Sequence, residues 1–205
     1  MGSIVTVLVI LAIIGIGGIA ILVGWLISAY NKLVSLKARF ENAFAQINVQ
    51  LTRRYDLIPN IVKIAKSYME HESKTLQNVI EARNGAVASL KDAAQSPGDP
   101  DSIENLNVAE KKFTESFQGL RIQLEAYPDL KANTVMMQLS EELTSTENRV
   151  AFARQGFNDA ATAYNIQRKS FPTALVANAF GHTRDAALLV FDNEKDIQAA
   201  PKIDL

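Results

Sequence analysis

The sequence predicts an all-α protein, in which one N-terminal transmembrane helix precedes an antiparallel four-helix bundle of long helices that can be kinked. Residues 4–27 contain no charged residue, and every Asp, Glu, Lys and Arg of the 205-residue chain lies at or after Lys32. From Lys32 onward, apolar residues recur at intervals of three and four, which is a helical period, and no window alternates as a strand would. The chain divides into an anchor (1–28), a helical bundle (29–172) and a C-terminal extension (173–205).

The apolar segment is long enough to cross a lipid bilayer. Its 24 residues form a helix about 36 Å long, and a hydrocarbon core is about 30 Å thick. Trp25 and Tyr30 lie where one membrane interface would be. A cleaved signal peptide is the less favoured alternative, because the apolar stretch is too long and no Lys or Arg precedes it. We therefore expect the bilayer to be a partner of residues 4–27.

The charges that follow the segment predict its orientation. Lys32, Lys37 and Arg39 come directly after it, and Glu41 alone opposes them locally. Positive charge accumulates on the cytoplasmic side of membrane helices. This favours a cytoplasmic C-terminal domain.

Four apolar stripes predict helices in the soluble part of the chain, at residues 28–54, 57–95, 103–126 and 129–169. Breaks that contain Pro or Gly separate most of them, at residues 96–101 and 127–129. Between the first two, Asp56 is a plausible N-cap with Pro59 in the first turn, where a missing N–H does little harm. The sequence leaves open whether the chain reverses there or only kinks at Pro59.

The residue types that carry chemistry are not assembled in any recognisable pattern. The chain has no cysteine and two histidines, His71 and His182. In Glu70-His71-Glu72 the side chains point to different helix faces, unlike the Glu-x-x-His spacing of di-iron bundles. Phosphate-loop, dinucleotide-binding and serine-hydrolase motifs are missing, and a net charge of −1 indicates no preference for nucleic acid. We expect no catalytic activity, cofactor, metal site or nucleic-acid partner.

One group of residues is a candidate interaction site. An imperfect internal repeat aligns Asp-Leu-x-x-Asn at 56–60 with the same pattern at 129–133, each preceded by a tyrosine, which suggests that both lie at the pole farthest from the membrane. At this pole an acidic partner or a lipid phosphate could bind the arginine pair. The structural alternative is compensation of a helix dipole together with pairing to a nearby aspartate. The candidate residues are Arg53, Arg54, Tyr55, Asp56, Tyr127 and Asp129.

Two longer blocks carry a family resemblance. They are Arg-Arg-Tyr-Asp-Leu-Ile-Pro-Asn at 53–60 and Tyr-Pro-Asp-Leu-Lys-Ala-Asn at 127–133, and shorter segments such as Thr-Glu-Asn-Arg-Val at 146–150 agree in order. Over residues 4–181 the chain resembles the LemA family of bacterial membrane proteins. The resemblance implies an N-terminal anchor, a four-helix soluble domain and a bacterial source, and it implies no established reaction. The family usually ends soon after the position of Gly181, whereas this chain continues to Leu205.

These observations predict a membrane-anchored helical scaffold or interaction protein of the bacterial envelope, held in the cytoplasmic membrane. The expected partner is another membrane or envelope protein, with a second copy of the chain as a further candidate. The alternative is a ligand-binding or sensing module whose site is the membrane-distal pole of the bundle.

Overall fold

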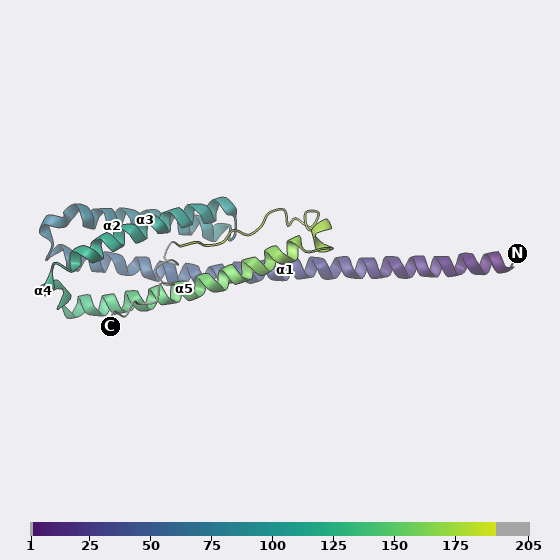
Figure 1. Cartoon of the computed structure of the whole chain (residues 1–205), viewed down its shortest axis with the longest axis horizontal. Helices are drawn as coiled ribbons and strands as arrows, with labels where there is room; N and C mark the ends of the chain where they lie inside the picture. The colour runs from purple at the N-terminus through teal and green to yellow at the C-terminus, as the bar shows by residue number, and fades with distance from the viewer. Residues whose placement is uncertain (1, 192–205) are drawn as a thin grey trace, which may run out of the picture.

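The computed structural model of the chain describes residues 2–191, except for the side chains of Ile4 and Glu70. Helices joined by short connections make up this part of the chain, and it contains no strand. Figure 1 shows a long helix, α1, whose second half lies in a bundle while its first half projects alone. The predicted all-α fold, with an apolar N-terminal helix and a helical bundle, is confirmed.

The long helices alternate in direction along the bundle (Figure 1), so that neighbouring helices are antiparallel. A short 3₁₀ helix, η1, precedes α2, and a single turn, α4, precedes α5. A second 3₁₀ helix, η2, follows α5, and residues 176–191 then have no regular secondary structure. The bounds are α1 Gly2–Lys66, η1 Glu70–Glu72, α2 Ser73–Gln95, α3 Pro100–Leu124, α4 Pro128–Lys131, α5 Thr134–Lys169 and η2 Thr173–Leu175.

The predicted break between residues 54 and 57 is wrong. Helix α1 continues through Pro59 to Lys66, and the chain reverses between α1 and α2 instead. Pro59 has no N–H, so it cannot donate to the carbonyl of Tyr55 one turn earlier. The Arg83 side chain of α2 supplies the missing donor, with its Nε 3.1 Å from the Tyr55 oxygen. A tertiary contact therefore satisfies the carbonyl that proline leaves free, and Asp56 lies inside the helix rather than capping one.

The predicted helix 129–169 is also interrupted. Asp129 lies in the first turn of the four-residue helix α4, and a new helix begins at Thr134. The Asn133 side chain caps α5 by accepting hydrogen bonds from the backbone N–H groups of Val135 and Met136, at 3.0 and 3.1 Å. Asparagine is a strong N-cap because its side-chain oxygen satisfies donors that have no partner inside the helix.

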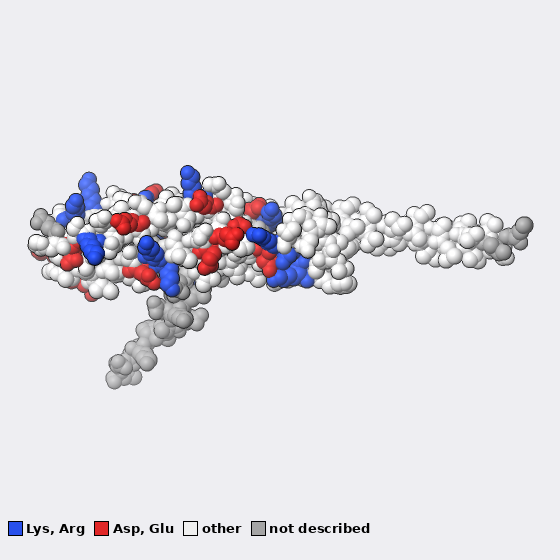
Figure 2. Space-filling view, turned by 90° about the horizontal axis from the view of Figure 1, so that it is seen from above, with Lys and Arg blue, Asp and Glu red and all other residues white. Residues whose placement is uncertain are grey.

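The predicted apolar stripes supply most of the core. Many of the large side chains that are less than 2% exposed belong to α1, α3 and α5; they include Leu33, Phe44, Ile47, Leu51, Ile103, Leu106, Leu120 and Phe157. In contrast, no other part of the described chain covers the apolar first part of α1, which is long and apolar enough to cross a membrane. Figure 2 shows acidic and basic residues spread over the bundle and none on the projecting part of α1.

Candidate functional site

Three helix pairs of the bundle pack closely, and one side stays open. Helix α1 packs against α2 and α5, and α2 packs against α3, but within residues 2–191 the backbones of α3 and α5 make little contact. The gap between them is a seam that residues 183–191, here called the strap, partly fill. Figure 1 shows the strap as part of the thin yellow-green trace that returns along the bundle.

Asparagine side chains hold the strap by its main chain. Asn158 of α5 donates to the Leu189 carbonyl and accepts from the Leu189 N–H, both at 2.9 Å. Asn165 makes the same pair of bonds with Ala186, both at 2.8 Å. From the opposite wall, Asn107 of α3 donates to the Leu188 carbonyl at 3.2 Å and accepts from the Val190 N–H at 3.0 Å. These contacts involve backbone groups that every residue type except proline presents, so they select an extended chain rather than a sequence.

The spacing of these side chains matches an extended peptide. Asn158 and Asn165 are separated by two helical turns, or about 10 Å along the axis of α5. Ala186 and Leu189 are three residues apart, which is also about 10 Å in extended chain. Arg154, one turn before Asn158, donates to the carbonyl of residue 191 at 3.1 Å. The strap therefore runs antiparallel to α5, and α5 carries a ladder of polar contacts at the pitch of an extended backbone.

Side-chain contacts also hold the strap against the bundle. Ala186 and Leu189 are 5% and 1% exposed, and their side chains fill the apolar floor of the seam. Asp185 accepts hydrogen bonds from Arg168 of α5. Burial by itself raises the pKa of the Asp185 carboxyl, but the basic side chains that bond to it outweigh this effect and lower the pKa. The N–H of Ala187 donates to the Gly98 carbonyl at 2.9 Å.

Gly98 is required where the loop between α2 and α3 meets the strap. Its φ of +82° lies in the left-handed region, which side chains disfavour. A Cβ built there would lie 2.9 Å from the Phe40 ring and 3.1 Å from the Cβ of Ala186. The glycine thus permits the backbone to approach both the core and the strap.

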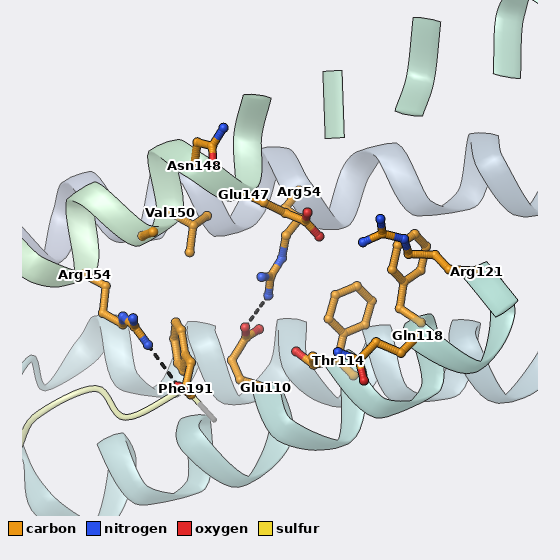
Figure 3. Close-up of a pocket in the computed structure, with 13 residues that line it drawn as sticks. Arg54, Glu110, Thr114, Gln118, Arg121, Glu147, Asn148, Val150, Arg154 and Phe191 are labelled. Atoms are coloured by element: carbon orange, nitrogen blue, oxygen red, sulfur yellow. Dashed lines mark hydrogen bonds and ion pairs between the residues drawn. The ribbon is translucent and has the colours of Figure 1, made fainter. Parts of the chain in front are cut away.

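Beyond Phe191 the seam opens into a cavity of about 230 Å³. Its walls are residues of α3 and α5, with Arg54 of α1 among the lining residues and the Phe191 ring at one end. Figure 3 shows Arg54 pointing toward Glu110, and Arg154 pointing toward Phe191. The guanidinium groups that line the cavity belong to Arg54, Arg121 and Arg154, and the carboxylates belong to Glu110 and Glu147.

Glu110 joins α1 to α3 through a buried cluster. The side chains of Arg54 and Glu110 are 8% and 1% exposed and form an ion pair, and the Tyr55 hydroxyl donates to the second oxygen of the same carboxylate. Burial by itself lowers the pKa of Arg54, but the charge of Glu110 outweighs this effect and raises it. Burial raises the pKa of Tyr55, as does the nearby carboxylate. Arg54 therefore stays charged and Tyr55 stays protonated.

This cluster is not arranged for proton transfer. The Glu110 oxygens are already occupied by two donors, and neither the tyrosine nor the arginine can deprotonate near neutral pH. The Nε of Arg54 is buried without a hydrogen-bond partner in the described structure. Across residues 2–191, no group of three or more His, Asp or Glu side chains is arranged to hold a metal ion.

The six candidate residues do not form one site. Arg54 and Tyr55 meet at Glu110, whereas Arg53 is exposed and pairs with Glu142 of α5 at 2.8 Å. Asp56 pairs with Arg83 of α2 at 3.3 Å. Tyr127 and Asp129 lie beside and within α4, and no hydrogen bond or ion pair of the described residues links them to positions 53–56. Arg54 is twelve residues, or about 18 Å, from the end of α1. It therefore lies within the bundle rather than at its pole.

Sequence reasoning missed Glu110, although the helical spacing carried a signal. Ile103, Leu106, Phe113 and Phe117 of α3 are all buried, and Glu110 occupies the position in this series where another apolar residue is expected. Arg54 interrupts the buried series of α1 in the same way. A charged residue at a core position requires a buried partner. Because each needs a partner of opposite charge, Glu110 and Arg54 could have been predicted to form a pair.

The match to known proteins covers both walls of the seam and the strap. A sequence model of the LemA family matches residues 43–205, which is most of the chain. The chain belongs to the LemA family. Three relatives share this LemA-family similarity at modest identity. The magnetosome protein MamQ 2 of Paramagnetospirillum magneticum is 23% identical over 189 residues, which cover 85% of this chain and 70% of the relative.

Two further relatives match over a smaller share. Protein LemA of Metamycoplasma hominis is 26% identical over 148 residues, which are 72% of this chain and 63% of that protein. The magnetosome protein MamQ of Magnetospirillum gryphiswaldense is 23% identical over 174 residues, which are 78% of this chain and 64% of the relative. The LemA-family chain is thus similar to membrane-associated helical proteins, and the match indicates no catalytic function.

Proposed function

We propose that this chain is a non-catalytic scaffold of the bacterial envelope, which residues 4–27 anchor in the cytoplasmic membrane. The helical domain would hold another membrane or envelope protein, or a second copy of the chain. The observation that carries this proposal is the seam between α3 and α5, whose asparagines bind the main chain of the strap and which continues into the cavity that Phe191 lines. The names of the magnetosome relatives support a membrane setting.

The form of α1 supports a scaffold. A single helix of 65 residues joins the apolar segment to the bundle, and no loop interrupts it. Movement of the bundle relative to the membrane therefore requires bending of a continuous helix, whereas a flexible linker would allow the domain to move freely. A binding surface on the bundle is in this way held at a set distance from the bilayer.

The first test is crosslinking of the full chain in native membranes, followed by affinity capture. A photoreactive amino acid at Gln118, which is exposed and lines the cavity, probes the seam. The same group at the exposed Gln155 of α5, which is outside the cavity lining, is the matched control. We expect a crosslinked protein from Gln118 and none from Gln155. Crosslinks from Gln155 alone would place binding elsewhere, and recovery of monomer from both positions would remove support for the scaffold.

The orientation of the domain needs a separate measurement. Lys32, Lys37 and Arg39 favour a cytoplasmic bundle. Because the chain has no cysteine, Ala88→Cys on the exposed face of α2 introduces a single thiol. A membrane-impermeant maleimide added to intact cells should leave this thiol unlabelled, and labelling before lysis would reverse the proposed orientation.

The cavity favours a second candidate function, the binding of a small anion. Arg54, Arg121 and Arg154 line it together with the polar side chains of Thr114 and Gln118, and the carboxylates of Glu110 and Glu147 leave an excess of one positive charge in the lining. Inorganic phosphate and a small dicarboxylate, tested by thermal shift on the full chain, should then stabilise the wild type. The Arg121→Gln variant should lose this effect, while Arg149→Gln, an exposed control on α5, should keep it. Equal stabilisation of all three proteins would exclude the cavity as the binding site.

A further inference from the structure

An uncharged turn lies at the end of the bundle next to the projecting part of α1. Residues 170–181, here called the proximal turn, connect α5 to the strap and contain no Asp, Glu, Lys or Arg. Figure 1 shows this segment beside α1, where the helix leaves the bundle. The proximal turn is fixed from inside, because Thr173 and Ala177 are 3% and 2% exposed. Phe180 packs edge-on against Tyr30 of α1, with ring centroids 5.3 Å apart.

The exposed side chains of the proximal turn are mostly apolar, with Asn178 as the polar exception. Phe171 and Leu175 are 82% and 74% exposed, although the turn is otherwise anchored in the core. Single exposed apolar residues are ordinary on a protein surface. Here two large ones share one short uncharged segment, and exposed apolar groups that gather in one place mark a contact surface.

The position of the proximal turn along α1 identifies the contact. The first buried residue of α1 is Ala29, which lies two residues, or about 3 Å, beyond Ile27 at the end of the apolar segment. The headgroup layer of a bilayer is about 5–7 Å thick on each side. The Tyr30–Phe180 contact therefore lies at headgroup level when residues 4–27 cross the hydrocarbon core. Aromatic side chains favour this layer.

The charges around the turn fit the same place. Lys169 precedes it and Arg184 follows it, and their side chains are 63% and 67% exposed. Basic residues beside an apolar tip are typical of segments that lie in the membrane interface, because they meet lipid phosphates while the tip enters the acyl boundary. Both basic side chains pair with acidic neighbours within the chain. The membrane contact is therefore inferred mainly from the uncharged tip.

We infer that the proximal turn is a second membrane contact, which inserts Phe171 and Leu175 into the headgroup layer of the bilayer that residues 4–27 cross. This inference rests on the proposed anchoring of the chain. A second contact beside the span restrains the tilt of the bundle, because α1 cannot lean away from that side without withdrawing apolar side chains into water.

Tryptophan fluorescence of the full chain in vesicles tests the inference. The wild type has a single tryptophan, Trp25, which reports on the anchor. In a Trp25→Phe background, Phe171→Trp probes the proximal turn and Phe152→Trp is the matched control. Phe152 is 80% exposed, almost as much as Phe171, but it precedes the end of α5 by 17 residues, or about 26 Å.

The vesicles contain phosphatidylcholine and phosphatidylglycerol, with and without bromine on the acyl chains close to the headgroups. We expect the bromine to quench Trp25 and the tryptophan at 171, whose emission is also blue-shifted, and to leave the tryptophan at 152 unchanged. Leu175→Trp should behave as Phe171→Trp does, and circular dichroism checks that each variant is folded.

The other possible fluorescence results would contradict either the membrane contact of the proximal turn or the anchoring of residues 4–27. If Trp25 is quenched but the tryptophans at 171 and 175 are not, the proximal turn does not touch lipid, and the anchor stands. Blue-shifted emission at 171 without quenching means that protein, such as a second copy, covers the turn. If Trp25 itself is not quenched, the anchoring proposal fails together with the inference.

Discussion

Replacing Glu110 by leucine should leave the buried Arg54 charge without its ion-pair partner, with Glu147 as the remaining nearby carboxylate. The Glu110 side chain is 1% exposed and accepts from both Arg54 and Tyr55. Removal of one partner of a buried ion pair costs about 3–5 kcal/mol, mostly through the charge that remains. For a domain of this size, 1 kcal/mol shifts the melting temperature by about 2–4 °C, so Glu110→Leu should melt about 6–20 °C below the wild type.

The double variant Arg54→Met/Glu110→Leu separates the charge from the loss of packing. With both charges removed, only the Tyr55 hydroxyl lacks a partner, which costs about 1–3 kcal/mol. The double variant should therefore be more stable than Glu110→Leu alone, and the exposed control Glu115→Leu should differ from wild type by about 0.5 kcal/mol at most.

Thermal unfolding of the full chain in detergent micelles, followed by far-ultraviolet circular dichroism, measures all four proteins. A double variant that melts no higher than Glu110→Leu would refute the reasoning, since the cost would then come from packing. A single variant that melts with the wild type would show that the pair is not buried in solution.

Three further predictions concern a buried histidine, the proline in α1 and two glycines. Burial, with help from nearby cations, lowers the pKa of His182 below its usual 6.5. The unfolded state then binds the proton more readily, so the stability of the fold decreases as the pH drops below about 6.5. His182→Gln should therefore reduce the change in melting temperature between about pH 5 and 7. Arg83→Met should lower the free energy of unfolding of the wild type by about 0.5–1.5 kcal/mol more than it lowers that of the Pro59→Ala variant. The reason is that alanine at position 59 restores the helical N–H donor that Arg83 replaces. A double-mutant cycle with no coupling would contradict this. Gly98→Ala should cost about 1–2 kcal/mol from its φ of +82° alone, and the close contacts of the new Cβ with Phe40 and Ala186 add to this cost. Gly85→Ala, where a Cβ meets nothing within 4 Å, should instead gain about 0.4–1 kcal/mol in chemical denaturation. Shifts of the same sign would refute the comparison.

Much of the fold could be predicted from the sequence because helical periodicity is local. The stripe of Leu33, Phe40, Ile47 and Leu51 faces the core as its spacing indicates. The prediction failed at Pro59, where a local rule favoured a new helix start. A side chain from another helix satisfies the carbonyl that proline leaves without a donor, and no property of the residues around Pro59 could reveal it.

The six candidate residues lie in separate places in the structure. Arg54 and Tyr55 take part in a buried cluster, but Tyr127 and Asp129 lie at α4, apart from it. The internal repeat suggested a common pole because a sequence alignment does not show where α1 ends. Once α1 continues to Lys66, residue 54 lies within the bundle and residue 129 at its end.

The sequence alone determined that this chain is helical, that its first part is apolar enough to cross a membrane, and which faces of its helices pack together. These properties depend on residue type and spacing along one helix. The three-dimensional packing set the rest: among residues 2–191, α3 and α5 make little contact with each other, Asn107, Asn158 and Asn165 hold the strap between them, and Glu110 pairs with Arg54. Those contacts join residues that are far apart in the chain, and they exist only because helix packing brings the groups within bonding distance.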